Sequence, residues 1–160
     1  MSKKSSFKHK LFEDVQSLPK DIQSLLSAAK DQLKMAYAPY SNFMVGAAAL
    51  LDDGQVFTGC NQENASYPLC ICAERVALYN IGTSLKDFKI KALAITAHNP
   101  TKALTEPVMP CGACRQVIQE FEARQGSAIT MYLTSDCAEV MRIKGISKIL
   151  PHSFSMDHLM

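Results

Sequence analysis

The chain has 160 residues, of which 48% are hydrophobic and 20% are charged, and its formal net charge is +2. This length suits one domain with an ordinary hydrophobic core, and the composition is that of a globular protein. The small net charge argues against a nucleic-acid-binding surface, and no apolar run approaches the ~18 residues of a membrane span. We therefore expect a cytoplasmic protein whose partners include neither a membrane nor a nucleic acid.

The N-terminal segment is basic and polar. Residues 1–10 are not followed by the apolar core of a signal peptide. Lysine and serine dominate up to residue 18, which predicts a flexible basic arm over residues 1–18. The remaining residues, 19–160, then form the catalytic or binding domain.

A helix and a strand hairpin are predicted next. Apolar residues recur at three- and four-residue steps over residues 21–37, which indicates a helix with one buried face. The nearly continuous apolar run 43–51 is typical of a strand covered on both faces. Asp52-Asp53-Gly54 is a turn signal, so residues 56–61 are expected to return as the partner strand.

Helices and strands alternate in the second half of the chain. Periodicity and stop signals place helices at residues 72–81 and 111–123, strands at 90–97 and 129–134, an edge strand at 140–144 and a short helix at 146–150. With the hairpin, this order predicts an α/β fold of three layers, with helices on both faces of a mixed, roughly five-stranded sheet.

The cysteines carry the strongest chemical signal. Without a secretion signal, a metal or catalytic role is favoured over disulfides. Cys72, Cys111 and Cys114 stand at predicted helix N-termini, where the backbone favours thiolate over thiol. Three thiolates can hold a zinc ion and leave its fourth position open for water. Cys60 and Cys137 stand alone and are predicted to be core residues.

Glu74 lies two residues after Cys72 in the first helical turn. This spacing keeps it off the face of Cys72, as expected for a general acid/base that acts on the water rather than binding the metal. Arg75 follows and is predicted to donate hydrogen bonds to the ligand sulfurs, with Arg115 as a second candidate. By themselves, a glutamate and an arginine here would indicate a helix cap and a surface ion pair.

Cys70 leaves a second metal arrangement open. If it joined the other three thiols, the site would be a closed Cys₄ centre of a zinc-stabilised binding module rather than an enzyme. The Cys-x-Cys spacing is awkward at a helix start, and a closed site would leave Glu74 without a role. We therefore favour the open site and expect Cys70 to line a pocket.

Cys72-Ala73-Glu74 followed by Pro110-Cys111-Gly112-Ala113-Cys114 resembles the zinc deaminase signature. The all-cysteine version, in a chain of this length, is similar to the homotetrameric cytidine deaminases, and the resemblance runs from about residue 37 to 154. It implies one Zn²⁺ per subunit, active sites shared between subunits, and hydrolysis of cytidine and 2′-deoxycytidine to the uridine forms plus ammonia in pyrimidine salvage.

The resemblance also implies substrate contacts. Phe43 would line the base pocket, Asn61 and Glu63 would hold the ribose hydroxyls, Ala73 would contact the base, and Phe154 would reach a neighbouring subunit's base. A nucleoside-antibiotic deaminase of the blasticidin type shares the three-cysteine site and is the nearest alternative; the Asn61 and Glu63 pair favours a ribose instead.

Overall fold

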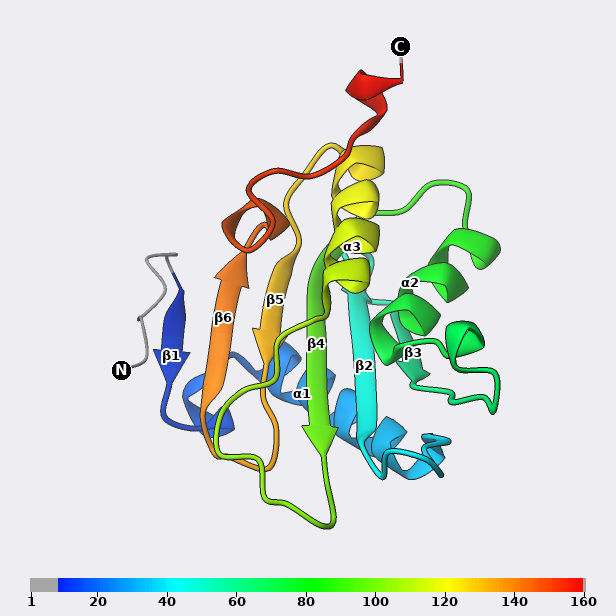
Figure 1. The fold of residues 1–160 in the computed structure, drawn as a ribbon. Coiled ribbons are helices and arrows are strands. Elements are labelled where there is room, and N and C mark those ends of the chain that lie inside the picture. The colour runs from blue at the N-terminus through cyan, green and yellow to red at the C-terminus, as the bar shows by residue number, and fades with distance from the viewer. Residues whose placement is uncertain (1–8, 160) are drawn as a thin grey trace.

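The protein is built on one mixed β-sheet (Figure 1), seen in a computed structural model that describes residues 9–159. Six strands lie in the order β1-β6-β5-β4-β2-β3. Strands β4 and β5 are parallel, and every other neighbouring pair in that order is antiparallel. The strands are β1 (Lys10–Phe12), β2 (Met44–Leu51), β3 (Val56–Cys60), β4 (Ile90–His98), β5 (Thr130–Leu133) and β6 (Val140–Lys144).

Helices cover both faces of the sheet. Helices α2 and α3 lie on one face and α1 lies on the other (Figure 1), so the predicted three-layer α/β fold is confirmed. Their bounds are α1 (Lys20–Asp31), α2 (Ala73–Ser84) and α3 (Gly112–Gln125). The chain also forms short 3₁₀ helices at Val15–Ser17, Gln32–Met35, Tyr67–Leu69, Ile146–Lys148 and Met156–His158. No helix in the described part of the chain has the length and hydropathy that a bilayer crossing requires.

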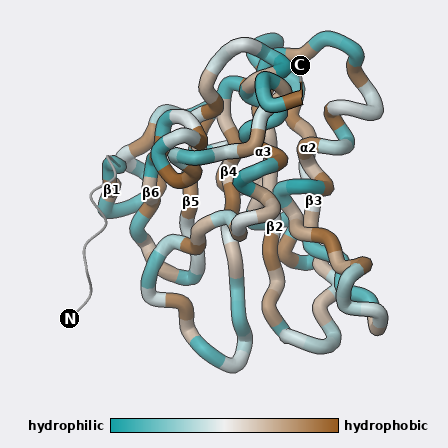
Figure 2. The backbone as a smooth tube through the Cα atoms, turned by 45° about the horizontal axis from the view of Figure 1, so that its top comes forward, coloured by the Kyte–Doolittle hydropathy of each residue, from teal (hydrophilic) through white to brown (hydrophobic). Residues whose placement is uncertain are grey.

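Two apolar layers hold the helices to the sheet. The larger packs α2 and α3 against one face around Leu78, Leu93 and Ile118, and the smaller packs α1 against the other around Leu25. Figure 2 shows the hydrophobic residues gathered along the central strands and the hydrophilic ones in the outer loops. Strand β4 is buried on both faces, which explains its almost continuous apolar sequence.

The sheet has one strand more than the roughly five predicted. The extra strand β1 comes from the segment predicted as an arm, and it pairs with β6, so β6 is not the edge strand that its sequence suggested. Phe12 packs on the α1 layer, with Lys10 and Arg142 over its ring at 4.6 and 5.7 Å. The division into residues 1–18 and 19–160 stays a prediction, and residues 1–8 lie outside the described part.

Several boundaries and two cysteines differ from prediction. The first helix turns into a 3₁₀ helix after Asp31, and α2 continues two residues past Gly82 to Ser84. Cys60 and Cys137 are half-buried rather than core residues, and their thiols donate to the carbonyls of Met35 and Glu139. The turn at Gly54 is as expected and has a φ of 91°, which suits glycine.

Gly59 on β3 sets how closely α2 approaches the sheet. A Cβ at this position would lie 2.6 Å from the Ala77 nitrogen and 2.7 Å from the Ala73 oxygen, both backbone atoms of α2. We expect Gly59→Ala to lower the free energy of unfolding by about 1–3 kcal/mol, since helix and strand must move apart. Chemical denaturation measures this change.

Gly82→Ala is the matched control. Its Cβ would meet only the tips of side chains at 3.5 Å or more, so we expect stability to be unchanged or raised. Equal stability of Gly59→Ala and the parent protein would show that the close approach of β3 to α2 is not required.

Candidate active site

Three cysteines converge between the two helices of the α2–α3 layer. The sulfur atoms of Cys72, Cys111 and Cys114 all lie within 4.8 Å of one another. The Cys72–Cys111 and Cys111–Cys114 sulfur pairs are 3.9 and 3.5 Å apart. Tetrahedral zinc with Zn–S bonds of about 2.3 Å requires sulfur separations of ~3.8 Å. The donor set therefore fits one zinc ion.

Local backbone structure explains this convergence. Cys72 and Cys111 are the N-cap residues of α2 and α3, with extended backbones, and neither side chain caps the backbone of its own helix. Each helix thus begins one residue later than the sequence predicted, and both thiols are free to point away from the helix backbone. Cys114 lies in the first turn of α3 and is buried. The strands beneath place the two helix starts side by side (Figure 1).

The surroundings stabilise negative charge on sulfur. Hydrogen bonding from the Cys114 thiol, helped by Arg75, lowers the pKa of Cys72 to about 5, and the same contact raises the pKa of Cys114. Arg75 Nη2 donates to the Cys70 carbonyl at 3.2 Å and lies 4.0 Å from the Cys72 sulfur. The structure thus brings Arg75 to the ligand sulfurs, whereas the Arg115 guanidinium donates to two backbone oxygens.

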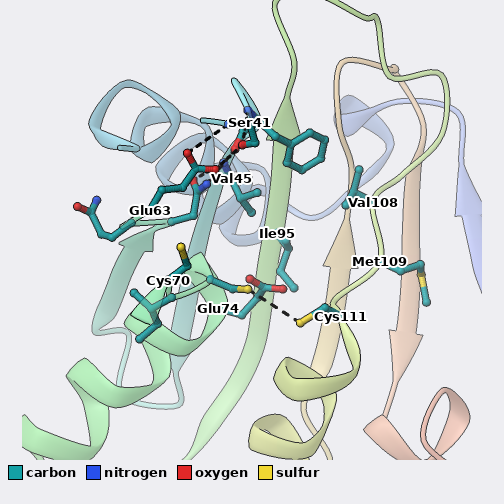
Figure 3. Close-up of a pocket in the computed structure, with 14 residues that line it drawn as sticks. Ser41, Val45, Glu63, Cys70, Glu74, Ile95, Val108, Met109 and Cys111 are labelled. Atoms are coloured by element: carbon teal, nitrogen blue, oxygen red, sulfur yellow. Dashed lines mark hydrogen bonds between the residues drawn. The ribbon is translucent and has the colours of Figure 1, made fainter. Parts of the chain in front are cut away.

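Glu74 is buried beside the three sulfurs. It is only 4% exposed, and desolvation raises the pKa of its carboxyl group, with repulsion from the Cys72 thiolate adding to this effect. Figure 3 shows Glu74 at the base of the pocket, which Cys111 also lines. A carboxyl group with a raised pKa is suited to both accept and release a proton.

A cavity of about 430 Å³ opens above these groups. This volume is in the range of pockets for small organic ligands. Its walls are mostly apolar, while polar groups stand at two ends, one at the sulfurs and one at Glu63 (Figure 3). The apolar lining is formed by Phe43, Val45, Ile71, Ile95, Val108 and Met109.

Comparison with known proteins identifies the family. Residues 19–130 match the model of the cytidine and deoxycytidylate deaminase zinc-binding region. The chain belongs to the cytidine and deoxycytidylate deaminase family. A cytidine deaminase of Sporosarcina psychrophila is 39% identical over 140 residues, which cover 87% of this chain and 95% of the relative.

Other cytidine deaminases support the assignment. One from Mycobacterium tuberculosis is 41% identical over 128 residues, covering 78% of this chain and 82% of the relative. The crystal structure of a cytidine deaminase from Burkholderia pseudomallei is 41% identical, with a TM-score of 0.70, and the match covers 82% of this chain and 97% of that chain. The predicted resemblance to this family is therefore confirmed.

In this deaminase-family chain, three of the predicted substrate residues line the cavity: Phe43, Asn61 and Glu63. Asn61 holds the Phe43–Val45 backbone, since its amide accepts from Val45 N and donates to Phe43 O, both at 2.8 Å. Glu63 accepts from the backbone N–H of Tyr40 at 2.8 Å and from both N–H and hydroxyl of Ser41. These contacts shape the pocket rim before any substrate arrives.

The other two predicted substrate residues do not line the cavity. Ala73 is fully buried in the first turn of α2. Phe154 is 57% exposed, and its ring stacks on His158 with centroids 5.4 Å apart. Both roles stay predictions, and that of Phe154 requires a second subunit.

Cys70 lies in the pocket wall and not in the metal cluster. Its sulfur accepts a hydrogen bond from Asn64 N at 3.2 Å, on the side of Glu63 (Figure 3). Among the described residues, the cluster consists of the other three cysteines alone. Sequence reasoning did not identify Val108 and Met109 as lining residues; their position just before Pro110 and the metal motif was the available signal.

Proposed function

We propose that the protein hydrolyses cytidine and 2′-deoxycytidine to uridine and 2′-deoxyuridine, with release of ammonia. The observation that carries this proposal is a buried carboxyl group, Glu74, beside three converging thiols at the base of a largely apolar cavity. Family membership supports the same reaction, because the relatives named above are cytidine deaminases.

The reaction forms a C4–O bond and breaks the C4–N bond of the base. Zinc held by Cys72, Cys111 and Cys114 would supply Lewis acidity, which lowers the pKa of water at the open position. Glu74 takes one proton from the attacking water and transfers it to ring N3. It then takes the second proton from the new C4 hydroxyl and delivers it to the amine, which departs as ammonia while the C4 carbonyl forms. The apolar walls exclude bulk water and strengthen the electrostatic contacts of the reacting groups.

The shape of the pocket supports one orientation of the nucleoside. The base enters against Phe43 and Val108 toward Glu74, and the sugar lies toward Glu63 at the opposite end. A carboxylate accepts hydrogen bonds from hydroxyl groups. The Ser41 hydroxyl, which already donates to Glu63, lowers the pKa of that carboxyl group and keeps it ionised for this role.

Glu63→Gln is expected to raise KM for cytidine by about tenfold to a hundredfold and to change kcat less. A hydrogen bond to a charged group contributes roughly 1.5–3 kcal/mol, and the sugar is remote from the reacting carbon. Steady-state kinetics with cytidine measure both constants. An unchanged KM would remove Glu63 from ribose recognition.

The proposed active protein is an assembly of subunits. We propose a homotetramer in which the exposed Phe154 of one subunit completes a neighbour's pocket, and a cytoplasmic location. Sedimentation equilibrium tests the oligomeric state. Phe154→Ala should then weaken cytidine binding without loss of zinc.

The function is tested by the ultraviolet absorbance of cytidine mixed with the purified protein, before and after chelation of the metal. We expect deamination that stops on chelation and returns with added zinc. Blasticidin S, run in parallel, tests the antibiotic-deaminase alternative, which faster turnover of that compound would favour. A zinc-loaded protein that turns over neither compound would favour the non-enzymatic zinc module.

A further inference from the structure

Arg115 occupies the first turn of α3, immediately after the buried ligand Cys114. Its guanidinium group makes two hydrogen bonds to backbone oxygens of separate segments. Nε donates to the Pro110 carbonyl at 2.8 Å, and Nη1 donates to the Ile149 carbonyl at 3.0 Å. Both bonds are partly buried, so water competes for these carbonyls less than it would at the surface.

These bonds, with one from its own backbone, surround Cys111. The backbone N–H of Arg115 donates to the Cys111 carbonyl at 2.9 Å, while its side chain holds the carbonyl of the preceding residue, Pro110. The two peptide units that flank the Cα atom of Cys111 are therefore both held by Arg115. Fixing both units fixes the direction in which the cysteine side chain leaves the backbone.

Cys111 is less constrained by its surroundings than the other two cysteines of the cluster. It is exposed, whereas Cys114 is buried and Cys72 is half-buried. It follows a long loop, residues 99–110, and its side chain contacts the Cys114 sulfur at 3.5 Å but does not cap the backbone of α3. Pro110 has no N–H, so its carbonyl is the only backbone hydrogen-bonding group through which that residue can be held.

Arginine is suited to this position by its shape. A planar guanidinium can donate in two fixed directions at once, whereas a lysine ammonium is a single point on a flexible stem. Arg115 uses this fork to join the Pro110 carbonyl to Ile149, just after the 3₁₀ turn Ile146–Lys148. The C-terminal segment thus braces the metal-binding loop through one side chain.

We propose that Arg115 is a positioning residue that fixes Cys111 in the geometry zinc requires. It acts through the Pro110 and Cys111 carbonyls and contacts no ligand sulfur by a hydrogen bond. This role concerns metal retention alone and holds whichever nucleoside the protein deaminates.

Gln116, the next residue of α3, offers a matched control. Its Nε2 donates to the Phe154 carbonyl at 2.8 Å, so it too ties the C-terminal segment to α3. It has no hydrogen bond to Pro110 or Cys111 among those of the described residues. Gln116→Ala therefore loosens the C-terminal segment and leaves the hold on Cys111 in place.

The test is the rate of zinc release from the full-length, zinc-loaded protein to a chromogenic chelator. We expect Arg115→Lys and Arg115→Gln to release zinc about tenfold faster than the parent protein, and Gln116→Ala to release it at the parent rate. The rise in Tm on adding zinc to the metal-free protein should also shrink in both Arg115 variants. Circular dichroism verifies that each variant is folded.

Two results would overturn the proposal. If both folded Arg115 variants release zinc at the parent rate, Arg115 does not position the ligand. If Gln116→Ala accelerates release as much as they do, the anchored C-terminal segment controls retention, and the hold on Pro110 does not. Since no nucleoside is used, a protein inactive toward cytidine would still give a decisive answer.

Discussion

Glu74→Gln is expected to lower the turnover of cytidine by roughly 10²- to 10⁴-fold while zinc content and Tm stay close to those of the parent protein. A positioned general acid/base contributes about this much to a rate. Glutamine has nearly the shape of glutamate but cannot carry the proton. Because the side chain is buried, the neutral amide is tolerated there without a desolvation cost for charge.

Glu122→Gln is the control for this experiment. Glu122 is another partly buried carboxyl group with a raised pKa caused by desolvation, and it accepts from Ile129 N and Ile146 N at 2.8 and 3.0 Å. It lies outside the pocket lining. We expect unchanged kcat and KM. Full activity of Glu74→Gln with zinc bound would remove Glu74 from the mechanism.

Cys111→Ala is expected to lose stoichiometric zinc, all activity and part of the stability of the fold. Zinc at about a thousandfold above its Kd stabilises a folded protein by ~4 kcal/mol. For a chain of this size, each kcal/mol shifts Tm by about 2–4 °C, so we expect a Tm lower by roughly 8–16 °C. The physical reason is that the ion joins the N-termini of α2 and α3.

Cys70→Ala separates a metal ligand from a pocket thiol. Its sulfur bonds Asn64 N and stands outside the cluster, so this variant should keep one zinc per subunit. Metal analysis of the purified variants and differential scanning calorimetry measure both effects. Loss of zinc from Cys70→Ala, with Cys111→Ala retaining it, would reverse the assignment of the ligands.

Much of the fold was predictable because local patterns and packing agree. The apolar run of β2, the turn at Gly54 and the alternation of helices with strands each have a direct sequence signature. Strand β1 was missed because three residues carry little periodic signal. Its pairing with β6 depends on Phe12 reaching the α1 layer, which is a tertiary contact.

The metal centre was predictable for a different reason. Thiol spacing at helix starts is local information, and Cys72 and Cys114 each lie within a few residues of a helix N-terminus. The pocket wall was harder, because Val108 and Met109 belong to a loop without periodicity. Arg115 was a second candidate to donate to the ligand sulfurs, but its guanidinium donates to backbone carbonyls. Adjacency to a ligand in the sequence does not determine which acceptor a long side chain reaches.

X-ray absorption spectroscopy of the zinc-loaded protein counts the atoms bound to the metal, and so distinguishes an open zinc site from a closed one. Cys72, Cys111 and Cys114 are the three thiols that converge. We predict three sulfur ligands at about 2.3 Å and one oxygen or nitrogen ligand. Four sulfur ligands would mean that Cys70 closes the site, and the account of an open catalytic position beside Glu74 would be wrong.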